Sequence, residues 1–164
     1  MNVKLKLTTL ISSLLLTLNI YAQSKIESNQ TFPWCIVAYD SLERTPDERI
    51  AMIKELGFTK YVYDWRAKHL KDTKNELTLT QKNNIELLGI WLWLNSKRDS
   101  LHQLSSANEK MFDIVKELNL KTTFLVSLSE NFFKNLNEKE SLTKAVNYID
   151  VICKKAKKIN CKIA

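Results

Sequence analysis

The residues best suited to chemistry lie at the end of an apolar stretch, residues 85–95. If this stretch is a β-strand, its side chains alternate, so that Trp91, Trp93 and Asn95 share one face at the carboxyl end of the strand. Two indoles and an amide offer flat apolar surfaces together with hydrogen-bonding groups. In parallel α/β folds ligands bind at the carboxyl ends of the strands, so this face is a candidate binding surface.

The opposite face of the same stretch predicts how it is held in the fold. Leu88, Ile90, Leu92 and Leu94 alternate with the aromatic residues, and the run as a whole is nearly continuously apolar. Such a run is typical of a strand in a parallel sheet that is covered on both faces. It is too short to span a membrane. We expect the aliphatic face to pack beneath helices.

Strand and helix signals alternate along the chain. Strands are predicted at 34–39, 60–65, 85–94 and 122–128, and a fifth begins at Cys161. N-cap residues predict the helix starts: Thr45 with Pro46 and Glu48, Asp72, Ser106 with Glu109, and Asn137 with Glu140. Left-handed C-terminal residues predict the ends: Gly57, the pair Asn83 and Asn84, Asn119 and Asn160.

This alternation predicts an α/β fold with parallel strands and right-handed crossovers. An open doubly wound sheet and a (β/α)8 TIM barrel compete, and the lack of a Gly-rich phosphate turn after the first strand disfavours the dinucleotide-binding version of the former. A complete barrel needs about 250 residues, and the chain has 164. We therefore expect an incomplete barrel of about four βα units plus the start of a fifth strand, from a fragment of a longer protein or a truncated product.

The N-terminus has the pattern of a secretory signal peptide. Lys4 and Lys6 precede an apolar segment, residues 7–20, and Ala22 offers a small residue for cleavage. An uncleaved membrane anchor is the alternative, although the segment is short for a span. The predicted organisation is a signal peptide at 1–22, a linker at 23–31 and the barrel part at 32–164. We expect export to the periplasm or medium, with no membrane attachment after cleavage.

The charge, the cysteines and the histidines do not predict a nucleic-acid surface, a disulfide framework or a metal site. The net charge is +7, and the Lys-rich segment 154–158 is typical of a solvated helix end rather than a nucleic-acid surface. The three cysteines make no disulfide framework, and buried thiols are expected, although a bridge between Cys153 and Cys161 stays open. His69 and His102 are far apart and are expected at the surface or in loops, without a metal motif.

Several ordered motifs resemble one family. They are Leu-Gly-Phe at 56–58, Tyr-Val-Tyr-Asp-Trp-Arg at 61–66, Ile-Trp-Leu-Trp-Leu at 90–94, Lys-Thr-Thr-Phe-Leu-Val-Ser at 121–127 and Asn-Phe-Phe at 131–133. From about Trp34 onward they resemble the N-terminal half of the sugar phosphate isomerase/epimerase family, the xylose isomerase-like TIM barrels. The resemblance implies a divalent metal held by Glu, Asp and His, and proton or hydride transfer next to a carbonyl of a sugar or polyol.

The metal ligands of that family come mostly from later strands, so we assign neither a metal site nor catalytic residues to this chain. The residues expected at the mouth of the barrel are nominated for substrate binding. An indole stacks on the apolar face of a sugar ring, and Asp, Asn and Ser side chains hydrogen-bond its hydroxyl groups. The nominated residues are Asp64, Arg66, Trp91, Trp93, Asn95, Ser127 and Asn131.

Some of the nominated residues, and some of the other residues expected near the mouth, also have a structural interpretation. Trp91 and Trp93 could fill the barrel core, and Asp64 could pair with Arg66 instead of acting as a base. Tyr39 and Asp40 either line the mouth or end the first strand. The pair Phe132 and Phe133 is expected to cover the base of its own loop rather than form a partner surface.

Three functions compete with the isomerase or epimerase. A metal-dependent endonuclease belongs to the same superfamily, but the predicted export and the lack of a basic stripe interleaved with aromatic residues argue against it. A carbohydrate-binding protein without catalysis would use the aromatic mouth alone. An inactive truncated barrel is the fourth alternative. The expected partner is a small sugar or polyol.

Overall fold

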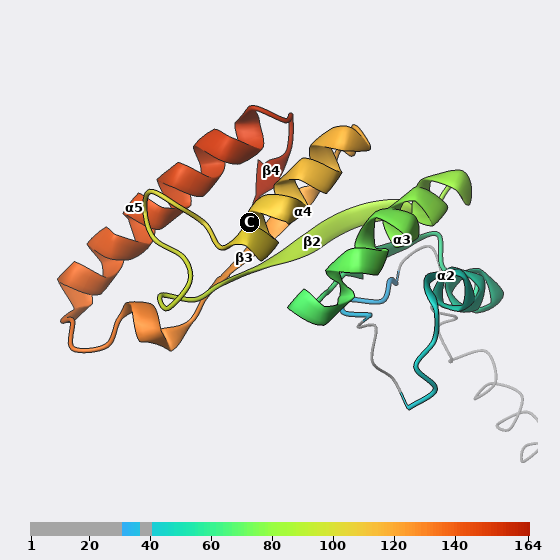
Figure 1. Ribbon diagram of the computed structural model, residues 1–164, viewed down its shortest axis with the longest axis horizontal. Helices are drawn as coiled ribbons and strands as arrows, with labels where there is room; N and C mark the ends of the chain where they lie inside the picture. Colours follow the sequence, from blue (N-terminus) through green and yellow to red (C-terminus); the bar gives the residue numbers. More distant parts are fainter. Residues whose placement is uncertain (1–30, 37–40) are drawn as a thin grey trace, which may run out of the picture. The chain divides into compact units, whose positions relative to one another are not determined.

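The computed structural model describes residues 31–36 and 41–164. The predicted signal peptide, nearly all of the linker, Tyr39 and Asp40 lie outside these residues. Phe32–Ala164 forms one compact unit, in which helices and strands alternate along the chain (Figure 1). Within the part of the chain that the structure describes, no helix is both long enough and apolar enough to cross a bilayer.

The described strands form a parallel sheet in the order β1-β2-β3-β4. They are β1 (Lys60–Tyr63), β2 (Glu86–Leu94), β3 (Thr123–Leu128) and β4 (Lys162–Ile163). The α-helices are α2 (Pro46–Glu55), α3 (Leu70–Lys82), α4 (Ser106–Glu117) and α5 (Glu138–Lys157), joined by the short 3-10 helices η1 (Ala67–His69) and η2 (Glu130–Phe132). The α/β class and the parallel sheet are as predicted.

The strands lie side by side in chain order. At the β1 edge, Ile36 makes a parallel bridge with Tyr63, and Val62 donates its N–H to the Pro33 carbonyl at 3.0 Å. The segment predicted as the first strand therefore starts beside β1. This place continues the chain order of the strands at that edge of the sheet. Doubly wound sheets reverse their strand order at a switch point, and the described strands show no such reversal.

Most helix ends follow the predicted chemistry. The capping boxes of Thr45 with Glu48 and of Asn137 with Glu140 are both present. Gly57 follows α2 with a φ of 77°, and Asn residues take the same left-handed conformation after the other helices. This conformation closes a helix without strain in Gly and at small cost in Asn. The Asn residues in this position are Asn84, Asn119 and Asn160.

Two predicted helix starts are wrong. Helix α3 begins at Leu70, because η1 leads directly into it, so Asp72 lies in the first turn and is no cap. The cap of α4 is Ser105 rather than Ser106, since the Ser105 side chain accepts the N–H of Asn108. Glu109 is therefore displaced from the capping position and forms an ion pair with Lys155 of α5 at 2.8 Å.

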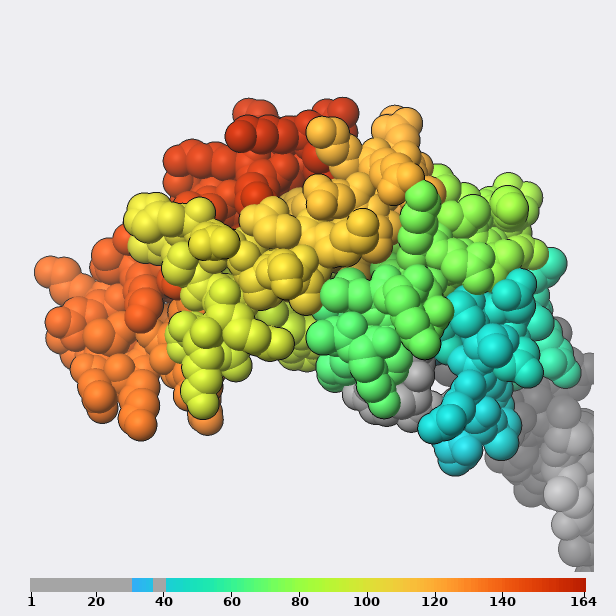
Figure 2. All heavy atoms as spheres, in the orientation of Figure 1, coloured from blue at the N-terminus to red at the C-terminus, as the bar shows by residue number. Residues whose placement is uncertain are grey.

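The helices cover one face of the sheet. The hydroxyl groups of Tyr61 and Tyr63 on β1 bond to Thr80 and Thr73 of α3, and Ile90 on β2 is fully buried beneath the helical layer. Neighbouring helices pack on each other in chain order, α2 on α3 and α3 on α4 (Figure 2). Burial of this apolar face supplies the main stabilisation of the unit.

A bulge shifts the start of β2. Tyr61 pairs with Leu87 and Val62 pairs with Gly89, so Leu88 has no partner in the register. As a result Leu87 joins the core and Leu88 does not. The predicted aliphatic face is thus right for Ile90, Leu92 and Leu94, which are buried, and wrong for Leu88.

The other face of the sheet carries the aromatic residues. In the β2–β3 register Trp91 lies beside Leu125 and Trp93 beside Ser127, and all four side chains are only half-buried. Gly89 lets Leu125 pack closely, because a Cβ at this position would lie 3.1 Å from the Leu125 side chain. This face therefore keeps open surface at the end of β2.

Several smaller predictions have mixed outcomes. All three cysteines are free thiols; Cys161 is buried as predicted, but Cys35 and Cys153 are exposed. His102 is exposed as predicted, whereas His69 is buried. Phe132 is buried and packs edge-on against Tyr148 of α5 at 4.6 Å, and Phe133 is half-buried, so Phe132 packs on the following helix.

Candidate functional site

A buried carboxylate organises the carboxyl end of β1. Asp64 is 1% exposed and follows directly after the strand. Its Oδ1 accepts hydrogen bonds from the Trp65 backbone N–H at 2.8 Å, the Arg66 guanidinium at 2.7 Å and the Trp93 indole N–H at 2.7 Å. Its Oδ2 accepts the Cys35 thiol at 3.0 Å. One side chain thus joins three segments of the chain.

These contacts set the ionisation of the cluster. Burial alone would raise the pKa of Asp64, but the donors from Cys35, Trp93, Arg66 and the Trp65 backbone together lower it below its ordinary value. Burial, and then the Asp64 carboxylate, raise the pKa of Cys35 to about 11. A carboxylate held ionised is a poor base and a protonated thiol is a poor nucleophile. Asp64 pairs with Arg66, in line with its structural interpretation.

An aromatic surface lies next to this carboxylate, and we define it as Phe32, Trp34, Trp91 and Trp93. The rings of Trp91 and Trp93 are stacked, with centroids 4.9 Å apart and planes 15° apart. Trp34 meets Trp91 edge-on at 5.8 Å, is 53% exposed, and lies 6.0 Å from Phe32. The surface is partly open, and its tryptophans belong to two different segments.

Arg66 and Trp65 connect the aromatic surface to the end of β1. The Arg66 guanidinium lies 5.0 Å from the centroid of the Trp93 ring, a cation–π distance. The Trp65 indole N–H donates to the Trp91 carbonyl at 2.7 Å. In contrast, the indole N–H of Trp91 is buried with no hydrogen-bond partner among the described residues.

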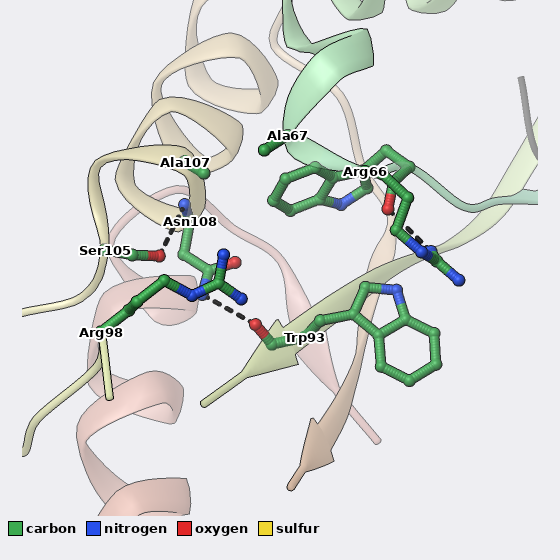
Figure 3. Close-up of a pocket in the computed structure, with 8 residues that line it drawn as sticks. Arg66, Ala67, Trp93, Arg98, Ser105, Ala107 and Asn108 are labelled. Atoms are coloured by element: carbon green, nitrogen blue, oxygen red, sulfur yellow. Dashed lines mark hydrogen bonds between the residues drawn. The ribbon is translucent and has the colours of Figure 1, made fainter. Parts of the chain in front are cut away.

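A cavity of about 270 Å³ opens between the ends of β1 and β2 and the start of α4 (Figure 3). Apolar and positively charged side chains lie around it, together with the first residues of the helix. The lining residues are Trp65, Arg66, Ala67, Trp93, Arg98, Ser105, Ala107 and Asn108.

A hydrogen-bond network fixes one wall of this cavity. Asp99 is buried, and its Oδ1 accepts the backbone N–H of Ser105 at 2.7 Å and the side-chain amide of Asn108 at 2.9 Å. Its Oδ2 accepts the backbone N–H of Asn95 at 2.8 Å. The Asn108 amide also donates to the Trp93 carbonyl at 3.0 Å. Together these bonds hold the start of α4 against the end of β2.

The structure brings some of the nominated residues together and separates others. Asp64, Arg66, Trp91 and Trp93 form one cluster, and Ser127 lies beside Trp93 on the same face. The Asn95 side chain accepts the backbone N–H of Lys97 and so closes a turn, outside the cavity lining. Asn131 is exposed on η2 and does not line the cavity either.

Of the eight residues that line the cavity, sequence reasoning nominated only Arg66 and Trp93, and the most informative of the six that it missed are Trp65, Arg98 and Asn108. Trp65 was part of a quoted motif but was not nominated. Arg98 lies in the loop after β2, to which we assigned no function from the sequence. Asn108 was missed because the helix cap was predicted at Ser106. With the cap at Ser105, Asn108 is the third residue of the helix. The sequence signal for this network is Asp99 itself, six residues before the cap, since Asp side chains readily bond to nearby backbone N–H groups.

The expected divalent metal does not fit the described residues. No three His, Cys, Asp or Glu side chains come together in residues 31–36 and 41–164 in a way that could hold an ion. The carboxylates of Asp64 and Asp99 already accept hydrogen bonds at both oxygens. A metal centre therefore stays a prediction from the resemblance, with ligands outside this chain.

Comparison with family models, with curated proteins and with solved structures finds no match to this chain. The function is accordingly argued from the geometry of the site.

Proposed function

We propose that this chain binds a sugar or polyol at the carboxyl end of its sheet, as the N-terminal part of a barrel of the sugar phosphate isomerase/epimerase kind. The observation that carries the proposal is the stacked pair Trp91 and Trp93, half-buried and next to the Asp64–Arg66 pair. Indoles present a flat apolar surface beside polar groups, a combination that suits the two chemical faces of a sugar ring.

The size and polarity of the cavity agree with a small ligand. Pockets for drug-sized molecules run from about 300 to 1,000 Å³, so a cavity of about 270 Å³ suits a ligand of monosaccharide size. On the aromatic surface, outside the cavity lining, the buried Trp91 indole N–H lacks a partner within the described part of the chain and would donate to a hydroxyl group that reaches it. Burying such a donor without a partner costs about 1–3 kcal/mol, which a bound hydroxyl would offset.

The strand order supports the barrel. Strands that follow one another in chain order, with right-handed crossovers, place successive helices on the same face of the sheet. The other face, which holds the aromatic surface, then becomes the interior of the barrel, and the carboxyl ends of the strands form its mouth. We place the sugar at that mouth, in a protein that is exported.

Catalysis is proposed from the resemblance alone. The complete enzyme would move a proton or hydride next to a carbonyl with the help of a metal bound outside the described residues. The residues of this chain would bind and orient the sugar. Asp64 is held ionised by its donors, so it is a poor base, and it positions Trp93 and Arg66 instead. The low pKa of Asp64 equally favours a second candidate, a carbohydrate-binding protein without catalysis.

Tryptophan fluorescence tests the binding proposal directly. The four tryptophans of the chain are Trp34, Trp65, Trp91 and Trp93, so the emission of the protein reports on this site. We expect saturable changes on titration with neutral sugars and polyols such as glucose, xylose and sorbitol.

A matched pair of variants locates the binding. Trp34→Ala removes an exposed ring of the aromatic surface and should weaken binding by up to about tenfold, since an aromatic contact contributes about 0.5–1.5 kcal/mol. Leu142→Ala changes an exposed apolar residue on α5 and should leave binding unchanged. No saturable change with any neutral polyol would reject the proposal.

A further inference from the structure

A second arginine besides Arg66 lines the cavity. Arg98 lies in the loop between β2 and α4, is exposed, and lines the cavity. Within residues 31–36 and 41–164 its guanidinium has no ion-pair or hydrogen-bond partner, and only its backbone N–H is bonded, to Asn95. An arginine offers five N–H donors in a planar fork that matches a carboxylate.

The start of α4 faces the same cavity. Ser105 and Ala107 contribute to the lining, and α4 is a 12-residue helix. The first N–H groups of a helix lack partners within the helix, and the aligned peptide dipoles place partial positive charge there. Both features favour an anion, although a helix start alone does not make a site.

Asn108 provides the independent observation. It is 1% exposed, and its amide nitrogen donates to the Trp93 carbonyl and to the Asp99 carboxylate. These two acceptors fix the orientation of the amide, because the reverse orientation would place oxygen against oxygen. The remaining oxygen, Oδ1, has no partner among the described residues. Asn108 and Arg98 both line the cavity (Figure 3).

An unpaired acceptor and an unpaired cation in the lining of one cavity indicate the chemistry of the ligand. The acceptor requires a hydroxyl donor, and the cation requires an anionic group close to that hydroxyl. A hydroxycarboxylate has both on neighbouring carbon atoms. A phosphate dianion suits the site less well, because the buried Asp99 carboxylate directly behind Asn108 would repel its second charge.

We propose that the cavity binds a sugar acid, with its carboxylate on Arg98 and the start of α4 and its neighbouring hydroxyl donating to Asn108 Oδ1. Trp65 and Trp93 provide the apolar walls for the carbon chain. The inference rests on the proposed binding of a polyol and names its class: the ligand is an acidic polyol, held at one end by charge and along its length by the aromatic rings.

Gluconate and sorbitol form a matched pair of probes for the full chain, because they share a six-carbon polyol chain and differ at one end, carboxylate against hydroxymethyl. We expect gluconate to bind at least tenfold more tightly than sorbitol by titration calorimetry. Added salt should weaken gluconate binding and leave sorbitol binding unchanged, since only the former depends on charge.

Two single-charge variants separate the cavity from the general charge of the protein. Arg98→Ala should abolish the preference for gluconate and keep the affinity for sorbitol. Lys97→Ala removes the same charge one residue away, from an exposed side chain outside the cavity lining, and should keep the preference. Both side chains are exposed, so both variants should fold.

The binding measurements distinguish a failure of the sugar-acid inference from a failure of the proposed polyol binding. Equal affinity for gluconate and sorbitol, or a preference for gluconate that persists in Arg98→Ala, would overturn the sugar-acid inference while sorbitol binding still supports the proposed function. Tighter binding of glucose 6-phosphate than of gluconate, lost in Arg98→Ala, would overturn the carboxylate in favour of a phosphate. If none of these probes binds, both proposals are overturned.

Discussion

Two buried carboxylates, Glu76 on α3 and Asp64 after β1, each pair with an arginine. Their environments nevertheless shift the two carboxyl pKa values in opposite directions. Glu76 is 0% exposed and receives the guanidinium of Arg49, which is itself buried, at both oxygens. Burial raises the pKa of Glu76, and the Arg49 donors offset only part of the rise. Asp64 is as deeply buried, but its pKa is lowered.

The two carboxylates also differ in the number and origin of their donors. The hydrogen bonds to Glu76 come from one side chain, and the pair joins α2 to α3 within the helical layer. Asp64 receives four donors from three segments, two of which, Trp93 and Arg66, belong to the binding surface. The first pair therefore stabilises the fold, whereas the second orders the site. Substitutions should separate these two roles.

The largest effect is expected for Arg49→Met. This change removes the donors to a fully buried carboxylate, and breaking a buried ion pair at one partner costs about 3–5 kcal/mol. Urea unfolding at neutral pH measures the loss. Because the pKa of Glu76 should rise further without Arg49, the folded variant binds a proton more readily than its unfolded chain, so its stability should recover as the pH falls toward the ordinary value of Glu.

The double variant Arg49→Met/Glu76→Leu serves as the control, since it removes both charges and should regain most of the lost stability. Sorbitol affinity should be unchanged in the double variant, because neither residue lines the cavity. A cost for Arg49→Met below about 1 kcal/mol would contradict the role assigned to this pair.

Asp64→Asn should lower the free energy of unfolding by less than Arg49→Met does. Unlike Arg49→Met, it should also disturb the binding surface. The amide keeps one acceptor oxygen but loses the charge, and hydrogen bonds to charged groups contribute about 1.5–3 kcal/mol each. We expect a loss of this size at neutral pH, together with a shifted tryptophan emission, since Trp93 and Trp65 both donate to Asp64.

The pH dependence of this loss has a definite sign. The pKa of Asp64 is lowered in the folded state, so its contribution is present above the ordinary value near 3.9 and is lost as the pH falls through the folded value. The unfolding free energies of the parent and of Asp64→Asn should therefore converge in strong acid. The stability of Arg49→Met should instead recover as the pH falls from neutral toward the ordinary value of Glu, above the range in which Asp64 loses its contribution. A common pH window for both variants would refute the contrast.

Local signals predicted most of the fold because the interactions that make them are local. Thr45 with Glu48 and Asn137 with Glu140 cap their helices within four residues, and Asn84 ends α3 by its own backbone conformation. The β2 bulge at Leu88 could not be predicted, because it depends on pairing with β1. The start of α4 was misplaced by one residue, since Ser105 and Ser106 are equally good caps in sequence.

The candidate site was predicted in part for the same reason. Trp91 and Trp93 follow from strand alternation, and Asp64 and Arg66 from the end of the neighbouring strand. Arg98 and Asn108 lie in the loop after β2 and on the helix that follows it. They reach the cavity because the Asp99 network sets the path of that loop. Alternation fixes the face of a strand residue, but no periodic pattern fixes the path of an irregular loop.

The smallest effect is expected for Asp150→Asn, which makes the same carboxylate-to-amide change at a third ion pair. Asp150 and Lys154 are one turn apart on α5, and both are exposed. Pairs of this spacing contribute about 0.3–0.5 kcal/mol, because water screens the charges and the side chains lose entropy on pairing. Urea unfolding should show a loss no larger than this, and added salt should remove it. A loss as large as that of Asp64→Asn would mean that the carboxylate itself decides the energy. The expected small loss would show that burial and the number of donors decide it, and these are the features that set Asp64 apart.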